Sequence, residues 1–321
     1  MAKEYQDFDV LTVGGMVCDF LIQPIPTTLF EHEITYVDSM KTNVGGDAAN
    51  EAVIMARLGM KVIIGTDGGN DSTGRGLVDY LEQNGVNTGN VILRDGDATR
   101  TNVVMIRADG ERHFIILNKR TPGFGQDGDW DFGLLDHIRA ISVGSIHMGP
   151  ALDNSLGAYL KAARQKGVIT VCDMVTNEYQ FPQERLKTEI LPYVDYLLPS
   201  EIEAEEMTGE KDPKKMAAVI RSWGVKNVVI KLGSKGCYGV NDDAEFELPV
   251  YPVSVVDTTG AGDNFTAGFV TAVINGLNFR QCANFASAVG GISTQGVGST
   301  AAVKNMEQVV AFMKQHGRYD F

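Results

Sequence analysis

The chain has 321 residues, 44% of them hydrophobic, and carries a formal net charge of −13 at pH 7. That hydrophobic share is enough for a sizeable core. The negative charge offers no basic field for nucleic acid or anionic lipid, so we expect neither nucleic acid nor a membrane as a partner. The sequence has no signal-peptide core, and its four cysteines form no CxxC pair. We therefore expect buried free thiols and a cytoplasmic protein.

Strands and helices alternate at the start of the chain. Residues 8–13 form a short apolar run that ends at Gly14 and Gly15, which is typical of a buried strand. An Ala-rich block with helical periodicity covers 47–59 and stops at a glycine. Residues 61–65 then predict a strand and residues 76–84 a helix. This order indicates an α/β protein with a parallel sheet covered by helices.

Two segments, at about 20–43 and 91–118, interrupt this alternation with β-type patterns. The second segment contains two β runs around the turn formed by Ala108, Asp109 and Gly110, which predicts a hairpin. A hairpin inserted into an α/β chain is a candidate flap over a binding site.

The alternation returns in the second half of the chain. We expect strands at 140–147, 168–173, 193–198 and 228–232, and helices at 155–166 and 201–208. No repeat and no low-complexity segment interrupts this half.

Polar residues follow the first predicted strand. Asp19 lies just past its end, and Gly45, Gly46, Asp47 and Asn50 open the helix predicted at 47–59. Ligands of open α/β sheets bind beyond the carboxyl ends of the strands, so these residues are candidates for ligand contact. The alternatives are a turn aspartate and an ordinary flexible loop before a helix.

Two further segments have both a structural and a functional interpretation. Ser200 and Glu203 have the spacing of a capping box at the start of the predicted helix 201–208. Gly233 and Gly236 follow Lys231 and form a hairpin turn when they are read alone.

The most specific motif is VVDTTGAGD at 255–263. It predicts a strand, a glycine-rich turn and the start of a helix. Glycines let a ligand approach the backbone, and the free N–H groups at a helix start favour an anion. Asp263 would repel a resting phosphate, so we interpret it as a base that takes a proton from a hydroxyl attacking a phosphoryl group. The alternative is a turn with a helix cap.

Together, these motifs closely resemble the PfkB/ribokinase family of carbohydrate kinases over nearly the whole chain. The resemblance implies a single domain, 1–321, with a ribokinase-like three-layer α/β/α core, a mostly parallel sheet and a small β lid formed by the two insertions. It also implies ATP, Mg²⁺ and a sugar as ligands, with K⁺ as a further candidate.

The resemblance assigns roles residue by residue. Asp263 is the catalytic base, and Gly260, Ala261 and Gly262 form the anion hole. The substrate contacts are Asp19, Gly45, Gly46, Asp47, Asn50 and Asp263, the ATP contacts are Ser200, Lys231, Gly233, Gly236, Gly260 and Gly262, the residue that orders Mg²⁺ through water is Glu203, and the monovalent-cation pair is Asp257 with Thr259.

Some positions depart from the family pattern. Asp47 stands where ribokinases usually have Lys, Ser200 replaces an Asn, and Gly149 with Pro150 follows a strand after which many ribokinases carry a substrate-binding Glu.

We expect an ATP-dependent kinase acting on a hydroxymethyl group of a sugar. A nucleoside kinase of the same superfamily shares every motif and stays open. A Rossmann dehydrogenase would need GxGxxG after the first strand, which is absent, and a non-catalytic regulator would not need Asp263.

The lid also predicts an assembly. Exposed strand edges tend to be covered, and relatives in this family often pair through their lids. We therefore expect a homodimer.

Overall fold

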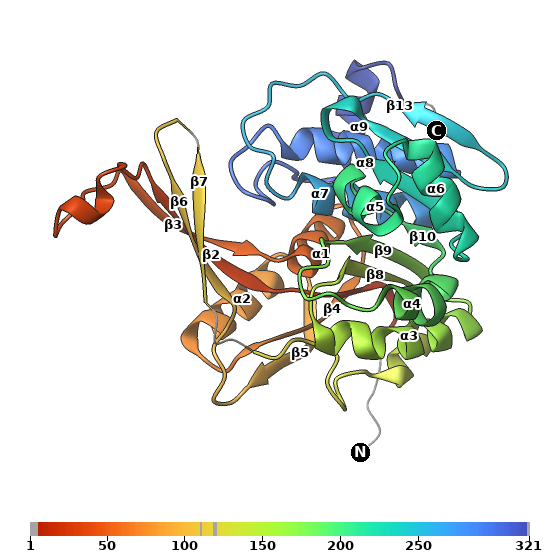
Figure 1. The fold of residues 1–321 in the computed structure, drawn as a ribbon, viewed down its shortest axis with the longest axis horizontal. Coiled ribbons are helices and arrows are strands. Elements are labelled where there is room, and N and C mark those ends of the chain that lie inside the picture. The colour runs from red at the N-terminus through yellow and green to blue at the C-terminus, as the bar shows by residue number, and fades with distance from the viewer. Residues whose placement is uncertain (1–5, 110, 118–120, 320–321) are drawn as a thin grey trace.

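The computed structural model of the chain describes residues 6–109, 111–117 and 121–319. Within that part, a nine-stranded sheet runs through the centre of the molecule in the order β13-β12-β11-β10-β9-β8-β1-β4-β5 (Figure 1). In this sheet the seven neighbouring strands β11, β10, β9, β8, β1, β4 and β5 run parallel, whereas β12 pairs antiparallel with both β11 and β13. The bounds are β1 Phe8–Val13, β4 Val62–Gly69, β5 Asn87–Arg94, β8 Ile138–Ile146, β9 Ile169–Met174, β10 Tyr196–Leu197, β11 Asn227–Lys231, β12 Cys237–Val240 and β13 Glu245–Leu248.

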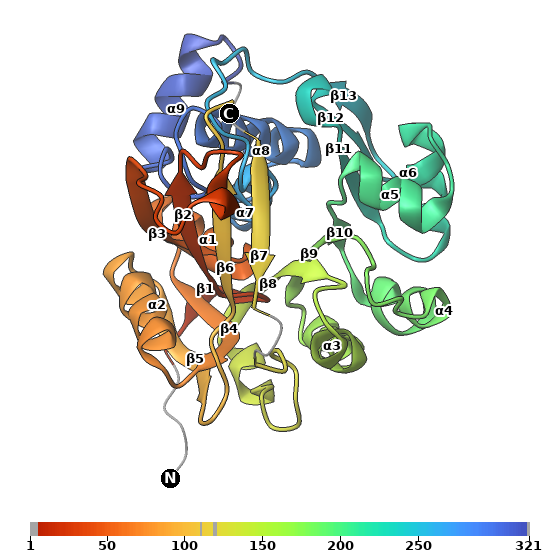
Figure 2. The same ribbon diagram turned by 60° about the vertical axis from the view of Figure 1, so that its left-hand side comes forward.

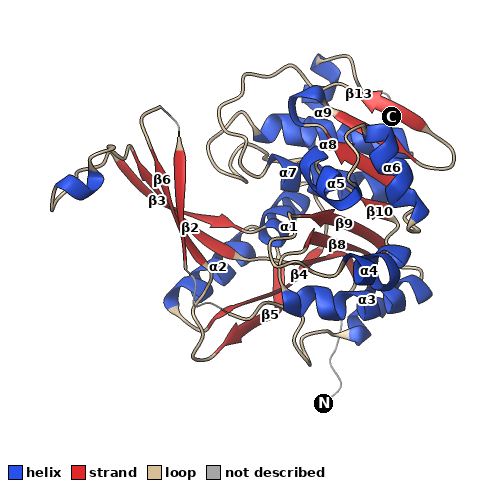
Figure 3. Ribbon diagram, viewed as in Figure 1, coloured by secondary structure: helices blue, strands red, loops and turns tan. Residues whose placement is uncertain are grey.

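Helices cover both faces of this sheet (Figure 3). One face packs against α1 Asp47–Arg57, α2 Ser72–Gln83, α7 Ala261–Ile274, α8 Phe279–Ser293 and α9 Met306–Gln315. The other packs against α3 Pro150–Gln165, α5 Glu201–Thr208 and α6 Pro213–Ser222, with the short α4 Gln183–Arg185 beside them. Val10 and Leu11 are neighbours in β1, yet they lie in opposite clusters because successive side chains of a strand alternate between its faces. The predicted three-layer α/β/α core is confirmed.

A second, four-stranded sheet stands beside the core in the order β3-β2-β6-β7. Its strands are β2 Val17–Gln23, β3 Ser39–Gly45, β6 Thr101–Ile106 and β7 Arg112–Ile116. Strands β6 and β7 pair antiparallel, as the predicted hairpin requires, although Gly110 of its turn lies outside the described residues. Figure 2 shows this sheet in front of α1 and α7.

The bounds of the inserted segments differ from those expected. The first part of the small sheet starts at Val17, and the second starts at Thr101. Residues 91–94 instead belong to β5, which pairs with β4 in the large sheet. Their apolar residues complete the edge of the core sheet, so alternation in sequence alone assigned them to the wrong sheet.

The strand expected before the glycine-rich turn is also absent. Val255 and Val256 lie in a loop, and each is 60% exposed. The N–H groups of Val256 and Asp257 both donate to the carbonyl oxygen of Thr294, at 2.8 and 3.1 Å, just after α8. The segment is therefore anchored to a helix end instead of a sheet.

Two expectations from composition can be compared with the structure. All four cysteines are buried and unpaired with one another, as predicted. Among the described residues, no helix has the length and apolar character needed to cross a lipid bilayer.

Candidate active site

The loop after β1 and the start of α1 are tied together by one carboxylate. Asp47 Oδ1 accepts the N–H groups of Gly15, at 2.6 Å, and Ala48, at 2.7 Å. Gly46 has φ of 90°, and a Cβ there would lie 2.5 Å from the carbonyl oxygen of Gly15, so only glycine fits. Burial raises the pKa of Asp47. These contacts give Asp47 a bracing role in the loop, and its predicted contact with substrate stays a prediction.

Asp19 lies in β2, on the face of the small sheet that carries Asn43 and Asn102 as its neighbours in register. Its Oδ1 accepts a 2.9 Å hydrogen bond from Asn102 Nδ2. A Cβ on Gly45 would approach Asp19 Oδ2 to 2.2 Å, so the glycine leaves room for this carboxylate. Burial raises the pKa of Asp19. The sequence analysis missed Asn102, because only strand register brings it to Asp19.

The predicted base and the predicted substrate amide are in direct contact. Asn50 Nδ2 donates to Asp263 Oδ2 at 2.6 Å, and Asn50 Oδ1 accepts from Ser299 Oγ at 2.8 Å. Burial raises the pKa of Asp263 to about 6, although the Asn50 hydrogen bond acts in the opposite direction. A carboxylate with this pKa is a base at neutral pH and still takes up a proton readily.

The glycine-rich turn leads directly into α7. Gly260 has φ of 71°, and a Cβ there would lie 2.5 Å from the Cβ of Ser299. Helix α7 begins at Ala261, so no earlier helical turn supplies acceptors for its first N–H groups, although that of Ala261 donates to the carbonyl oxygen of Thr258 at 3.2 Å. Lys231 lies beside these N–H groups: a Cβ placed on Gly262 would be 3.4 Å from Lys231 Nζ. A helix start with an adjacent ammonium group suits an anion such as phosphate.

Asp257 braces the same turn. Its Oδ1 accepts from Thr259 N at 2.9 Å and from Thr259 Oγ1 at 2.7 Å, and its Oδ2 accepts from Gly298 N at 2.9 Å. Asp257 thus links two segments: its Oδ1 contacts the turn, and its Oδ2 contacts the loop at 296–301. The monovalent cation expected at Asp257 and Thr259 stays a prediction.

Lys231 forms an ion pair with Asp173 at the end of β9. Asp173 Oδ2 also accepts a 2.8 Å hydrogen bond from Thr266 Oγ1 of α7. Burial alone would lower the pKa of Lys231, but the charges of Asp173 and Glu203 outweigh it and raise that pKa. The sequence analysis missed Asp173, whose only signal was its place at the end of a predicted buried strand.

Ser200 and Glu203 form the capping box at the start of α5. Glu203 Oε2 accepts from Ser200 N at 2.6 Å, and Ser200 Oγ accepts from Glu203 N at 3.3 Å. Burial raises the pKa of Glu203. Glu203 and Asp173 both interact electrostatically with Lys231, and carboxylate oxygens with water are ligands that Mg²⁺ takes. The donor set therefore fits the predicted role of Glu203, and the capping interpretation holds as well.

A cavity of about 480 Å³ opens beside Lys231 and the start of α7. Its lining includes four predicted ATP contacts, Lys231, Gly233, Gly236 and Gly262. It also includes residues that the sequence analysis did not select, among them Tyr251, Val253, Phe265, Gly290 and Gly291. Ser200 and Gly260 are not in its lining, although Ser200 forms a parallel bridge with Lys231. A mostly apolar pocket that ends at a helix start suits the nucleobase and the phosphates of a nucleotide.

Known proteins resemble this chain over nearly its whole length. The sequence model of the family described as "pfkB family carbohydrate kinase" matches residues 9–306. A ribokinase from Haemophilus influenzae is 27% identical over 312 residues, covering 95% of this chain and 98% of that protein. Fructokinase-1 of Oryza sativa subsp. japonica is 28% identical over 322 residues, covering 95% of this chain and 97% of that protein. The structure of Arabidopsis thaliana ribokinase complexed with ribose and ATP superposes with a TM-score of 0.81 at 25% identity, over 96% of this chain and 99% of that one.

Proposed function

This chain belongs to the pfkB family of carbohydrate kinases, and we propose that it transfers the γ-phosphate of ATP to a hydroxymethyl group of a sugar. The single observation that carries the proposal is the hydrogen bond between Asn50 and Asp263 beside the start of α7. It joins a group that can hold a hydroxyl to a half-buried base, next to backbone N–H groups that can hold a phosphate.

Each residue then has a defined task. Asp19 and Asn50 bind substrate hydroxyls, because carboxylate and amide side chains accept and donate in fixed directions. Asp263 takes the proton of the attacking hydroxyl. The amides of Gly260, Ala261 and Gly262 and the ammonium group of Lys231 stabilise charge on the transferring phosphate. Bound Mg²⁺, held through water by Glu203, would neutralise charge on the nucleotide phosphates.

The small sheet is the proposed lid, and we propose a second copy of the chain as its partner. Apolar side chains are exposed on both faces of this sheet: Phe114 at 51% and Ile116 at 55% share the face of Asp19, and Met40 at 68% lies on the face of Phe20. Exposed apolar patches of this kind mark interaction surfaces. We expect light scattering at micromolar concentration to report a dimer, and a monodisperse monomer would contradict this part of the proposal.

A nucleoside substrate is the second candidate. Met148 follows β8, and its Cε would lie 2.0 Å from a Cβ on Gly15, so the thioether lies against the glycine loop after β1. An apolar group at this place suits a nucleobase or another apolar substituent of the substrate better than a sugar hydroxyl. Arg100 forms an ion pair with Asp67 at 3.1 Å, so its charge is compensated within the chain.

One screen tests the proposal. We would measure ADP release in the presence of Mg²⁺ and ATP across pentoses, hexoses, keto-acid sugars, inositols and nucleosides. Turnover of a free sugar is the expected result. Turnover of nucleosides alone would favour the second candidate, and no turnover of any acceptor would overturn both.

A further inference from the structure

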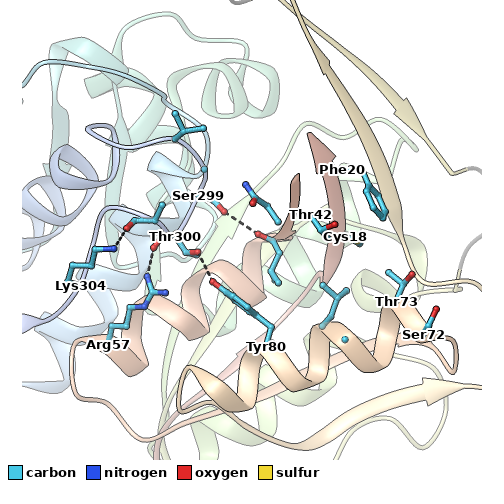
Figure 4. Close-up of a pocket in the computed structure, with 17 residues that line it drawn as sticks. Cys18, Phe20, Thr42, Arg57, Ser72, Thr73, Tyr80, Ser299, Thr300 and Lys304 are labelled. Carbon is cyan, nitrogen blue, oxygen red and sulfur yellow. Dashed lines mark hydrogen bonds between the residues drawn. The ribbon is translucent and has the colours of Figure 1, made fainter. Parts of the chain in front are cut away.

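A second cavity, of about 470 Å³, lies on the other side of the small sheet (Figure 4). Cys18 and Phe20 of β2 line it, whereas Asp19 between them faces the candidate active site with Asn102. Successive side chains of a strand alternate between faces, so β2 lies between the two spaces, whereas Asn43 of the edge strand β3 has the register of Asp19 and still lines this cavity. Helix α2 and the loop at 297–301 complete the walls. No predicted contact for sugar or ATP lines this cavity.

The charge of this cavity is opposite to that of the whole chain. Among the described residues that line it, none is Asp or Glu, while Arg57 and Lys304 are both present. Arg57 donates to neutral groups, the carbonyl oxygens of Thr300 and Val303 and the side chain of Asn84. Lys304 Nζ donates to the carbonyl oxygen of Ala301 at 2.5 Å. No ion pair of either cation occurs within the described residues. In a chain of net charge −13, two such cations at one cavity favour an anion.

The rest of the lining suits a hydroxylated ring. Figure 4 places Arg57 and Lys304 at one end of the cavity and the hydroxyl groups of Ser72 and Thr73 at the other. Tyr80 lies between them, and its hydroxyl is 3.2 Å from Thr300 Oγ1. Phe20 and Leu77 add apolar surface. A sugar ring offers both hydroxyls and apolar C–H faces, and a cavity of this size can hold a small metabolite.

We infer that this cavity binds a sugar monophosphate as an inhibitory effector, with its phosphate at Arg57 and Lys304 and its sugar toward Thr73. The loop at 297–301 is the wall that this cavity shares with the active site. Ser299 lines the cavity and donates to Asn50 Oδ1 at 2.8 Å, and Asn50 in turn holds Asp263.

Inhibition follows from what the phosphate would displace. Arg57 and Lys304 now hold the carbonyl oxygens of Thr300, Val303 and Ala301. A phosphate is a stronger acceptor for these cations than a neutral carbonyl. Its binding would release the loop, and release of the loop would weaken the contact between Ser299 and Asn50. The effect on activity rests on the proposed kinase function, whereas binding does not.

Calorimetric titration of the full chain with ribose 5-phosphate tests the binding, with ribose and inorganic phosphate as comparison ligands at constant ionic strength. Gly76→Leu fills the cavity, because Gly76 lines it and a Cβ there meets no atom within 4 Å. Lys304→Gln removes an exposed cation. Lys226→Gln, at an exposed lysine before β11, is the matched control. We expect binding to weaken about tenfold or more in the first two variants and to stay unchanged in the control.

The outcomes separate cleanly. Unchanged binding in Gly76→Leu and Lys304→Gln would place the ligand elsewhere and overturn the inference, as would no binding to the unaltered chain. Equally weakened binding in Lys226→Gln would show non-specific attraction to positive charge and would overturn the inference. Equally strong binding of inorganic phosphate would overturn the inferred contact with the sugar. Once an acceptor is known, ribose 5-phosphate should inhibit without competing with that acceptor, and Lys304→Gln should abolish this inhibition. Competitive inhibition that persists in Lys304→Gln would overturn the coupling to the active site.

Discussion

Asn50 and Asp263 are 213 positions apart in the chain, yet Asn50 Nδ2 donates a 2.6 Å hydrogen bond to Asp263 Oδ2. The contact joins the first turns of α1 and α7. Helix α1 also carries Asp47, which braces the loop after β1, and α7 follows the glycine-rich turn. One hydrogen bond therefore connects the proposed sugar side of the site with its phosphate side.

Replacing Asp263 tests the base directly. Asp263→Asn keeps the shape and the partner of Asn50 but cannot take a proton, so we expect turnover to fall by about 10²–10⁴-fold. ATP binding should persist. Burial disfavours the charged form of Asp263, so thermal stability above pH 6 should be equal or higher. Steady-state kinetics and a melting curve check both results, and near-normal turnover would remove Asp263 from the mechanism.

The pH dependence follows from the same carboxylate. Asp263 acts as a base only when it is deprotonated, and its pKa is raised to about 6. We expect kcat/KM to be constant near pH 8 and to fall about tenfold per pH unit below about 6. A profile measured from pH 5 to 9 checks this prediction. An acid limb at the ordinary aspartate value near 4 would show that Asp263 does not have this raised pKa in the free enzyme.

Removing Asn50, the hydrogen-bond partner of Asp263, should shift the acid limb of the pH profile. The hydrogen bond from Asn50 lowers the pKa of Asp263, so Asn50→Ala should shift the acid limb to higher pH and raise KM for the sugar. Ser299→Ala is the comparison, because it removes a bond to Asn50 Oδ1 but keeps the donor to Asp263, so its shift of the limb should be smaller. If both variants shift the limb equally, the shift does not come from the hydrogen bond to Asp263.

The ion pair between Lys231 and Asp173 should stabilise the fold as a unit. Lys231→Met leaves Asp173 buried without its counter-ion, and we expect it to lower the free energy of unfolding by about 3 kcal/mol. Lys231→Met combined with Asp173→Asn should recover part of that loss, because residue 173 no longer carries a buried charge without its counter-ion. Urea unfolding at pH 7 measures all three proteins. A double variant less stable than Lys231→Met alone would contradict the pairing.

Glu203 has two proposed roles that one substitution can separate. Gln still accepts the Ser200 N–H, so Glu203→Gln should preserve the capping box and the stability of the protein. It removes the negative charge, so the Mg²⁺ concentration needed for half-maximal activity should rise. Ser200→Ala is the reverse case, with about 1 kcal/mol lost in stability and an unchanged Mg²⁺ requirement. An unchanged requirement in Glu203→Gln would leave Glu203 with the capping role alone.

Local patterns in the sequence predicted most of the fold. Buried apolar runs, helical periodicity ending at glycine and the Asp109-Gly110 turn each depend on neighbouring residues, and most core strands, α1 and the β6–β7 hairpin formed as expected. The strand expected at 193–198 is reduced to Tyr196–Leu197. The capping box of Ser200 and Glu203 is equally local. The strand predicted at Val255 and Val256 was wrong, because the N–H groups of Val256 and Asp257 donate to Thr294, 38 and 37 positions later, and hold the segment as a loop.

By itself, the sequence determined the α/β class, the glycine-rich turn before Asp263 and its resemblance to a kinase family, since each is written in consecutive residues. Only the tertiary structure decided that Asn50 holds Asp263, that Asn102 reaches Asp19, and that Lys231 is neutralised by Asp173. It also decided that Arg57 and Lys304 share a cavity without a carboxylate among its described lining residues. Such pairings depend on strand register, burial and charge between distant segments, and no local pattern encodes them.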